Sequence, residues 1–145
     1  MNIKIVDFLP EHAKAAAQIE QQCFSAPWSE TAILDSYNTN TVFFMAFDSA
    51  IPIGYCGMQH VIDEGFVTNV AVLPEYRKNG VGKNLINRLV EYAKKQQLIS
   101  VSLEVRESNS IARHLYSTFG FLDVGRRKNF YSKPIEDAII MTLTL

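Results

Sequence analysis

A basic, glycine-containing loop between an apolar strand and an amphipathic helix restricts the fold of this chain more than any other feature. The strand pattern at residues 65–73 leads through Pro74 into residues 77–83, which read Arg-Lys-Asn-Gly-Val-Gly-Lys. Apolar residues then recur every third or fourth position, at Val81, Leu85, Ile86, Leu89, Val90 and Ala93. A strand, a turn and a helix in this order predict an α/β unit whose helix packs against a sheet.

The start of this helix is suited to an anionic ligand. The first N–H groups of a helix lack partners and carry partial positive charge, so they bind phosphate groups readily. Gly80 and Gly82 let the backbone approach a ligand closely, and the loop adds the cations Arg77, Lys78 and Lys83. We therefore expect a phosphate-bearing ligand here. The alternative is a glycine-rich turn whose cations are only solvated.

Two familiar nucleotide-binding motifs do not fit the loop. A Walker A motif requires glycine where the chain has Arg77, and serine or threonine where it has Asn84. A dinucleotide fingerprint requires a third glycine where the chain has Leu85. The pattern that remains is Arg-x-x-Gly-x-Gly.

Composition limits the classes of protein to be considered. The chain has 145 residues, 48% of them hydrophobic, and a net charge of -1, which predicts one domain over residues 1–145 and no nucleic-acid partner. No apolar run is long enough to span a membrane, and the N-terminus does not resemble a signal peptide. Cys23 and Cys56 are far apart and form no metal-binding spacing with the scattered histidines. We expect a cytoplasmic, metal-free monomer with reduced thiols.

Periodicity predicts a mixed sheet with helices on both faces, an α/β fold. Strands are expected at residues 3–8, 41–47, 52–62, 65–73, 99–106, 121–131 and 137–143. Helices are expected at residues 11–23, 29–37, 81–95 and 108–119. Four-residue spacing predicts two apolar helix faces, one of Ala15, Ile19 and Cys23 and one of Ile111, Leu115 and Phe119.

Glu104 is a candidate catalytic residue because it lies inside a predicted strand. Alternation places it with Arg106 on the face opposite Val101, Leu103 and Val105. Glutamate is uncommon in strand interiors. It is either a general base at a ligand cleft or a solvated residue that forms an ion pair with Arg106.

Four further residues are candidates for a site. Tyr116 is either a core tyrosine or a proton donor, since a pKa of about 10 keeps its hydroxyl protonated. Asn109 either caps the helix at residues 108–119 or reaches a ligand. Trp28 lies in a predicted loop and either packs as a lid or contacts a ligand. Tyr131, near the connection between the last two strands, either lines a substrate groove or covers the sheet edge.

Taken together, these segments resemble the GNAT acetyltransferase superfamily, and within it the RimI type. The motifs that carry the resemblance lie at residues 26–30, 69–72, 77–82, 103–109, 115–121, 126–131 and 136–141. The resemblance implies acetyl-CoA as co-substrate and a protein N-terminus as acceptor, specifically the alanine of small-subunit ribosomal protein eighteen. It implies a proton acceptor at Glu104, a proton donor at Tyr116 and peptide contacts at Trp28 and Tyr131.

The resemblance also implies which residues bind acetyl-CoA. These are Val70, Ala71 and Val72 through their backbone, then the loop residues Arg77, Lys78, Asn79, Gly80, Val81, Gly82 and Lys83, and finally Asn109. Because neither cysteine is placed as an activated nucleophile, we expect direct transfer in a ternary complex. Two alternatives stay open: a GNAT enzyme that acetylates a polyamine or aminoglycoside, and a non-catalytic acyl-CoA sensor.

Overall fold

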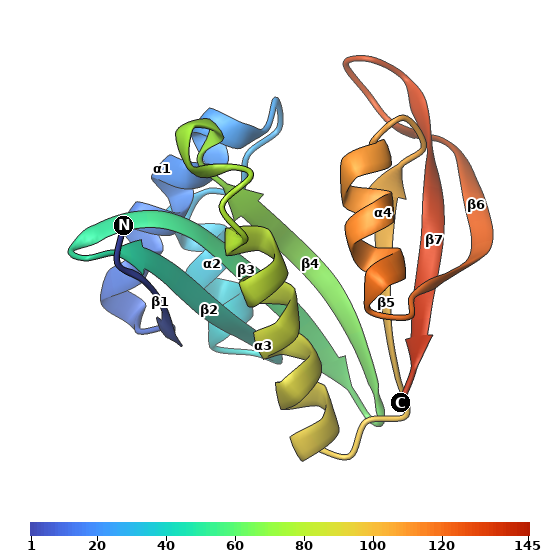
Figure 1. The fold of residues 1–145 in the computed structure, drawn as a ribbon, viewed down its shortest axis with the longest axis horizontal. Coiled ribbons are helices and arrows are strands. Elements are labelled where there is room, and N and C mark those ends of the chain that lie inside the picture. Colours follow the sequence, from blue (N-terminus) through green and yellow to red (C-terminus); the bar gives the residue numbers. More distant parts are fainter.

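The chain folds around one seven-stranded sheet with helices on both faces, in a computed structural model that describes residues 1–145. Figure 1 shows this sheet divided into a larger and a smaller part. Its strands are β1 (Ile3–Asp7), β2 (Thr41–Asp48), β3 (Ile51–Val61), β4 (Glu64–Val72), β5 (Ser100–Arg106), β6 (Leu122–Tyr131) and β7 (Glu136–Thr144). The α/β fold predicted from periodicity is confirmed.

The helices follow the predicted order, with bounds shifted by one or two residues. They are α1 (Ala13–Cys23), α2 (Glu30–Tyr37), α3 (Val81–Lys95) and α4 (Ser110–Thr118), with short 3₁₀ turns at Pro10–His12 and Pro74–Tyr76. Ser29 begins α2 as predicted, because its side chain accepts the Ala32 N–H at 3.1 Å. None of the helices combines the length and apolarity that crossing a bilayer requires.

Sheet topology combines hairpins with one parallel crossover. The strand order is β1-β2-β3-β4-β5-β7-β6, and only β4 and β5 run parallel to each other. Helix α3 forms the β4–β5 crossover, which parallel neighbours require. This arrangement places the start of α3 just beyond the end of β4.

The two parallel strands separate soon after they begin. Their pairing covers only Glu64 to Phe66 of β4 and Ser100 to Ser102 of β5. Beyond it the strands diverge, so β5, β6, β7 and α4 stand apart from the rest of the sheet at their upper ends in Figure 1. The sheet is therefore split between β4 and β5, and the edges of both strands face the split.

Each face of the sheet has its own hydrophobic core. Helices α1 and α2 cover one face, where their side chains pack with Phe43, Tyr55 and Ala71. Helix α3 covers the other, and its predicted apolar face is confirmed because all six residues are buried: Val81, Leu85, Ile86, Leu89, Val90 and Ala93. The recurrence of apolar residues every third or fourth position therefore predicts the buried face of α3 correctly.

The predicted apolar face of α4 is wrong at its first member. Ile111 is 78% exposed, and Tyr116 is the buried residue of this helix. Helix α4 covers only the narrow part of the sheet beyond the split, so it buries one side chain deeply instead of a full stripe. Tyr116 therefore lies in the core and beside the split at once.

Candidate functional site

A cleft of about 770 Å³ follows the split between β4 and β5. It brings together six of the predicted site residues, which come from β4, β5, the end of β6, α4 and two loops: Trp28, Val70, Glu104, Asn109, Tyr116 and Tyr131. The basic loop and the start of α3 are not in the lining of this cleft. They lie after β4 instead, at the end of the strand that forms one wall.

The backbone of β4 presents polar groups to the split. Leu73 N–H donates to Ile53 O of β3 at 2.9 Å, so the alternate residues Val70 and Val72 turn their N–H groups toward the side where β5 has moved away. The pairing of β3 with β4 is irregular next to Asn69, as bulges beside binding sites often are. Donors on this edge are available to an oxygen atom of a ligand.

The predicted phosphate loop has a helix start without side-chain caps. Gly80 occupies the N-cap of α3 in the left-handed region at φ 78°, where glycine carries no steric penalty. The first bond of the helix joins Asn84 N–H to Gly80 O at 3.0 Å, which leaves the three preceding N–H groups free. Asn79 braces the turn through bonds to the carbonyls of Tyr76 and Arg77, both at 3.1 Å.

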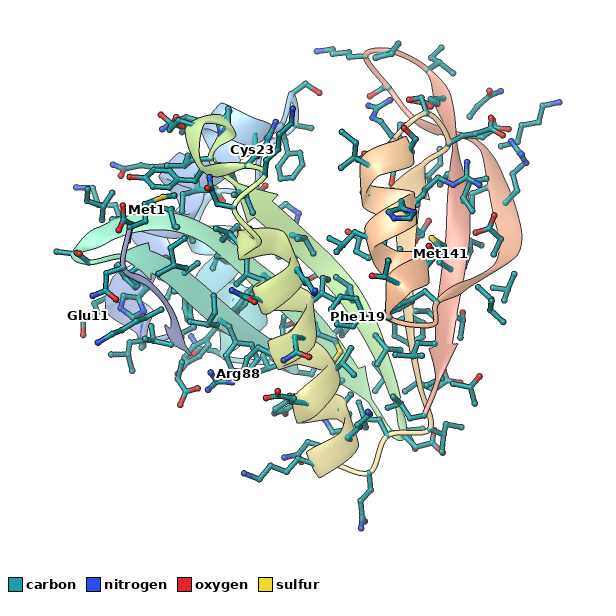
Figure 2. All side chains as sticks on the ribbon, in the orientation of Figure 1. Met1, Glu11, Cys23, Arg88, Phe119 and Met141 are labelled. Atoms are coloured by element: carbon teal, nitrogen blue, oxygen red, sulfur yellow. The ribbon has the colours of Figure 1, made fainter.

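The side chain of Arg77 is held against the end of β4. Its Nε donates to Val72 O at 3.1 Å, and Nη2 lies 3.8 Å from Cys23 Sγ. Figure 2 shows Cys23 at the end of α1, close to the loop before α3. Burial raises the pKa of the Cys23 thiol, an effect that Arg77 only partly opposes. The thiol is therefore protonated at neutral pH and is a poor nucleophile.

Glu104 forms an ion pair with Arg127 and not with Arg106, the partner considered in the sequence analysis. Its carboxylate contacts Arg127 Nε on β6 at 2.9 Å, with 33% of the Glu104 side chain exposed. Arg106 instead contacts Glu136 at 3.2 Å. The predicted alternation of β5 is confirmed, since Val101, Leu103 and Val105 are buried. Glu104 therefore lies on the same side of the sheet as α1 and α2.

Tyr116 approaches the cleft from the opposite side of the sheet. It is 8% exposed and packs in the α3 core, with its ring 5.9 Å from that of Phe121. Burial raises the pKa of Tyr116 to about 12, so its hydroxyl stays protonated across the physiological range. The core alternative is confirmed, and Tyr116 also lines the cleft. Its role as a proton donor stays a prediction.

Asn109 caps a helix while it lines the cleft. Its Oδ1 accepts the N–H of Ala112 at 3.2 Å, which confirms the capping alternative. This bond fixes the residue at the start of α4, on the wall that also carries Tyr116. Contact between Asn109 and a ligand stays a prediction.

A buried acidic residue that the sequence analysis did not identify holds the Trp28 loop. Glu20 is 1% exposed, and its carboxylate accepts the Trp28 N–H at 2.9 Å and the Tyr55 hydroxyl at 2.7 Å. Of the predicted α1 face, Ile19 is buried, and Ala15 and Cys23 are half-buried against the same core. The position of Glu20 four residues after Ala16, on the buried face of α1, is a signal for a buried carboxylate but not for its partners.

Arg106 holds the opposite rim of the cleft. Its guanidinium lies over the Tyr131 ring at 4.5 Å and donates to the carbonyls of Ser132 at 3.1 Å and Pro134 at 3.0 Å. Cation–π contact and two backbone bonds together restrain the β6–β7 loop. Tyr131 is thereby kept at the cleft, where it faces the Trp28 loop across the opening.

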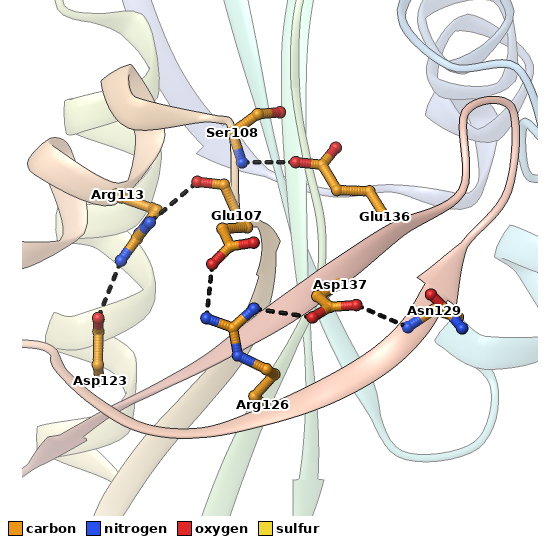
Figure 3. Close-up of polar contacts among 8 residues, drawn as sticks. All are labelled: Glu107, Ser108, Arg113, Asp123, Arg126, Asn129, Glu136 and Asp137. Atoms are coloured by element: carbon orange, nitrogen blue, oxygen red, sulfur yellow. Dashed lines mark hydrogen bonds and ion pairs between the residues drawn. The ribbon is translucent and has the colours of Figure 1, made fainter.

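Behind this rim, a network of ion pairs joins the start of α4 to β6 and β7 (Figure 3). Arg126 bridges Glu107 and Asp137, and Glu136 accepts the Ser108 N–H at 2.6 Å. The bond from Arg126 lowers the pKa of Glu107, and the bond from Ser108 lowers that of Glu136. Both contributions to stability are present above the unfolded pKa of about 4.3 and are lost as pH falls through the lower folded value.

Replacing Arg126 with glutamine is expected to separate these two effects. The pKa of Glu107 should return toward about 4.3, while that of Glu136 stays low because Ser108 is unchanged. NMR titration of the side-chain carboxyl carbons measures both values in one experiment. Equal shifts at the two residues would contradict the assignment of Glu136 to the Ser108 bond.

Comparisons with known proteins place this geometry in a family. The sequence model of the acetyltransferase (GNAT) family matches residues 13–121. The chain is 37% identical over 131 residues to the bS18-alanine N-acetyltransferase of Haemophilus influenzae, covering 88% of this chain and 89% of that protein. The chain belongs to the GNAT family. This agrees with the resemblance that the motifs indicate.

Two further comparisons involve the same GNAT enzyme of Escherichia coli. That bS18-alanine N-acetyltransferase is 34% identical over 133 residues, with 90% of each chain covered. The crystal structure of the ribosomal-protein-S18-alanine N-acetyltransferase superposes with a TM-score of 0.91 over 98% of this chain and 93% of that one, at 32% identity. The GNAT fold, including the split sheet, therefore extends over nearly the entire chain.

Proposed function

We propose that this protein transfers the acetyl group of acetyl-CoA to the N-terminal alanine of ribosomal protein bS18. The relatives named for this reaction are 34% to 37% identical and match along nearly their full length. The observation that carries the proposal is the cleft, which receives Glu104 from one side of the sheet and Tyr116 from the other. The proposed proton acceptor Glu104 and the proposed proton donor Tyr116 thus lie on opposite sides of the sheet, beside the edge of β4.

The start of α3 fits the pyrophosphate of a CoA thioester. Free N–H groups at residues 81–83 and the adjacent cations suit two phosphates. A Cβ added at Gly82 would lie 3.7 Å from Leu115, and one at Gly80 would meet nothing within 4 Å, so the backbone surface is open. We infer that Arg77, Lys78, Asn79, Gly80, Val81, Gly82 and Lys83 bind the pyrophosphate and that Val70, Ala71, Val72 and Asn109 bind the rest of the cofactor.

The proposed reaction is direct transfer. Glu104 takes a proton from the α-amino group, whose pKa of about 7.7–8.0 leaves much of it protonated at neutral pH. The free amine then attacks the thioester carbon, and the Val72 N–H stabilises the negative oxygen of the tetrahedral intermediate. As the C–S bond breaks, Tyr116 donates to the departing sulfur, and the second proton that the nitrogen loses as the amide forms restores the Tyr116 hydroxyl. No acetyl-enzyme is required, and Cys56 is fully buried.

The acceptor enters between two aromatic loops in this proposal. Trp28 is anchored by Glu20 and Tyr131 by Arg106, so the opening has a fixed width before any substrate arrives. Such preorganisation favours an extended chain that is held along its length. A polyamine or aminoglycoside is the alternative acceptor, and a non-catalytic acyl-CoA sensor is a weaker one.

A panel of acceptors tests the proposal. We expect acetyl transfer to a peptide with the N-terminal sequence of bS18, and at least tenfold lower kcat/KM for polyamines and aminoglycosides, which cannot occupy both aromatic loops. Transfer is measured by release of free CoA thiol and by the mass of the product. Preference for the small amines would refute the peptide acceptor. Binding of acetyl-CoA without any transfer would favour the sensor.

A further inference from the structure

Asn69 has a polar atom that no group of the protein satisfies. This residue lies on β4, lines the cleft and is 6% exposed. Its Nδ2 donates to Glu20 Oε2 at 3.4 Å, whereas its Oδ1 is buried without a partner. Buried polar atoms are nearly always paired, and an exception usually has a functional reason. The free acceptor therefore requires an explanation.

Glu20 fixes which atom of the Asn69 amide is left free. The Glu20 carboxylate is 1% exposed and already accepts hydrogen bonds from Tyr55 and Trp28. Such a group attracts donors, so Asn69 must turn its NH₂ toward it and its oxygen away. Both residues are buried, Glu20 at 1% and Asn69 at 6% exposure, so solvent does not replace this contact. The arrangement leaves a buried hydrogen-bond acceptor of fixed polarity, Asn69 Oδ1, on a residue that lines the cleft.

Asn69 lies on the same side of the sheet as the proposed base. Asn69 contacts α1 through Glu20, and Ala71, two residues on, packs in the α1–α2 core. Glu104 lies on this side too, because its neighbours Leu103 and Val105 pack in the opposite core. Two acceptors therefore belong to the two walls of one cleft. Both are on the side where the Trp28 and Tyr131 loops open.

We propose that Asn69 Oδ1 accepts a hydrogen bond from the α-amino group of the acceptor. This inference rests on the proposed function, because it concerns the amine that the enzyme acetylates. A neutral amine has two N–H bonds and one lone pair. When Glu104 removes a proton, the lone pair is left where that N–H bond pointed, toward Glu104, and the amine must rotate about its Cα–N bond before it can attack. By holding one of the two remaining N–H groups, Asn69 favours the rotational state in which the lone pair faces the thioester. Asn69 thus orients the nucleophile without taking a proton.

A pair of peptides that differ only in the amine tests this contact. The first begins with the N-terminal alanine of bS18, and the second has propionyl in place of that alanine and so lacks the amino group. In the presence of CoA, Asn69→Ala is expected to weaken binding of the first peptide about tenfold, as loss of a hydrogen bond to a charged group predicts. Binding of the second peptide should change less than twofold. Calorimetry measures both dissociation constants.

Two further variants keep the test decisive. Glu20→Gln preserves the volume but offers its own NH₂, so Asn69 can turn its oxygen inward, and we expect the same selective loss for the amine-bearing peptide. Asn87→Ala, on the exposed surface of α3, should affect neither peptide. Equal weakening of both peptides in Asn69→Ala would overturn the inference and leave the proposed function intact. Failure of the unmodified enzyme to bind or acetylate the bS18 peptide would overturn both.

Discussion

Replacing Glu104 with glutamine is expected to lower kcat/KM for the bS18 peptide by about two orders of magnitude or more. Glutamine has the same shape but cannot accept a proton from the α-amino group. The fold should persist, because the Glu104–Arg127 pair is partly exposed and such pairs contribute only about 0–1 kcal/mol. The measurement is steady-state acetylation, with thermal unfolding recorded in parallel.

The pH dependence of the residual activity provides a second signature. Without a base, the variant can use only amine that is already deprotonated. Its rate should therefore rise about tenfold per pH unit up to the amine pKa of about 7.7–8.0 and then level off. The parent enzyme can also use protonated amine because Glu104 accepts the proton, so the deficit of the variant should be largest at low pH.

Glu107→Gln is the matched control for this variant. It makes the same chemical change three residues away, where the carboxylate contacts Arg126 instead of the cleft. We expect its kcat/KM to stay within about twofold of the parent value, as is usual for surface changes away from a site. Unchanged activity in Glu104→Gln would refute the role given to Glu104, and equal losses in both variants would indicate a general effect of charge.

Periodicity in the sequence correctly predicts the features that depend on a single helix or strand. Helix α3 must bury a stripe, so its six apolar positions identify the buried face. Alternation along β5 likewise places Glu104 opposite Val101 and Leu103. The phosphate loop is local too, since its glycines and the helix start adjoin in sequence. The predicted helix face, strand alternation and helix start are confirmed because no distant part of the chain changes them, whereas phosphate binding by the loop stays a prediction.

Features that depend on several elements were missed or wrong. Ile111 has the spacing of a buried residue and is exposed, because the sheet beneath α4 is too narrow to cover a full helix face. The ion pair of Glu104 comes from Arg127 on β6, two strands away in the sheet. The contact of Glu20 with Asn69 spans 49 residues. None of these three features has a signal in the neighbouring sequence, because they depend on the order of the strands and on the split between β4 and β5.

Changing Tyr116 to phenylalanine is expected to lower kcat by about 10- to 100-fold, less than the change at Glu104. The size follows from two pKa values. Burial raises the pKa of Tyr116 to about 12, whereas the cysteine thiol, taken as the reference for the thiol of CoA, has a pKa of about 8.5. Complete proton transfer to a free thiolate would therefore be uphill by roughly 5 kcal/mol, at about 1.4 kcal/mol per unit. Tyr116 must act mainly by donating a hydrogen bond to the sulfur as its charge develops.

A hydrogen bond to a charged group contributes about 1.5–3 kcal/mol, which corresponds to the predicted range. Phenylalanine keeps the ring packed against Phe121, so acetyl-CoA binding and the melting temperature should change little. Steady-state kcat at saturating substrates measures the effect. An unchanged kcat would make Tyr116 a core residue only. A loss above about 10⁴-fold would exceed what one hydrogen bond contributes, and would mean that the full proton transfer occurs in the rate-limiting step.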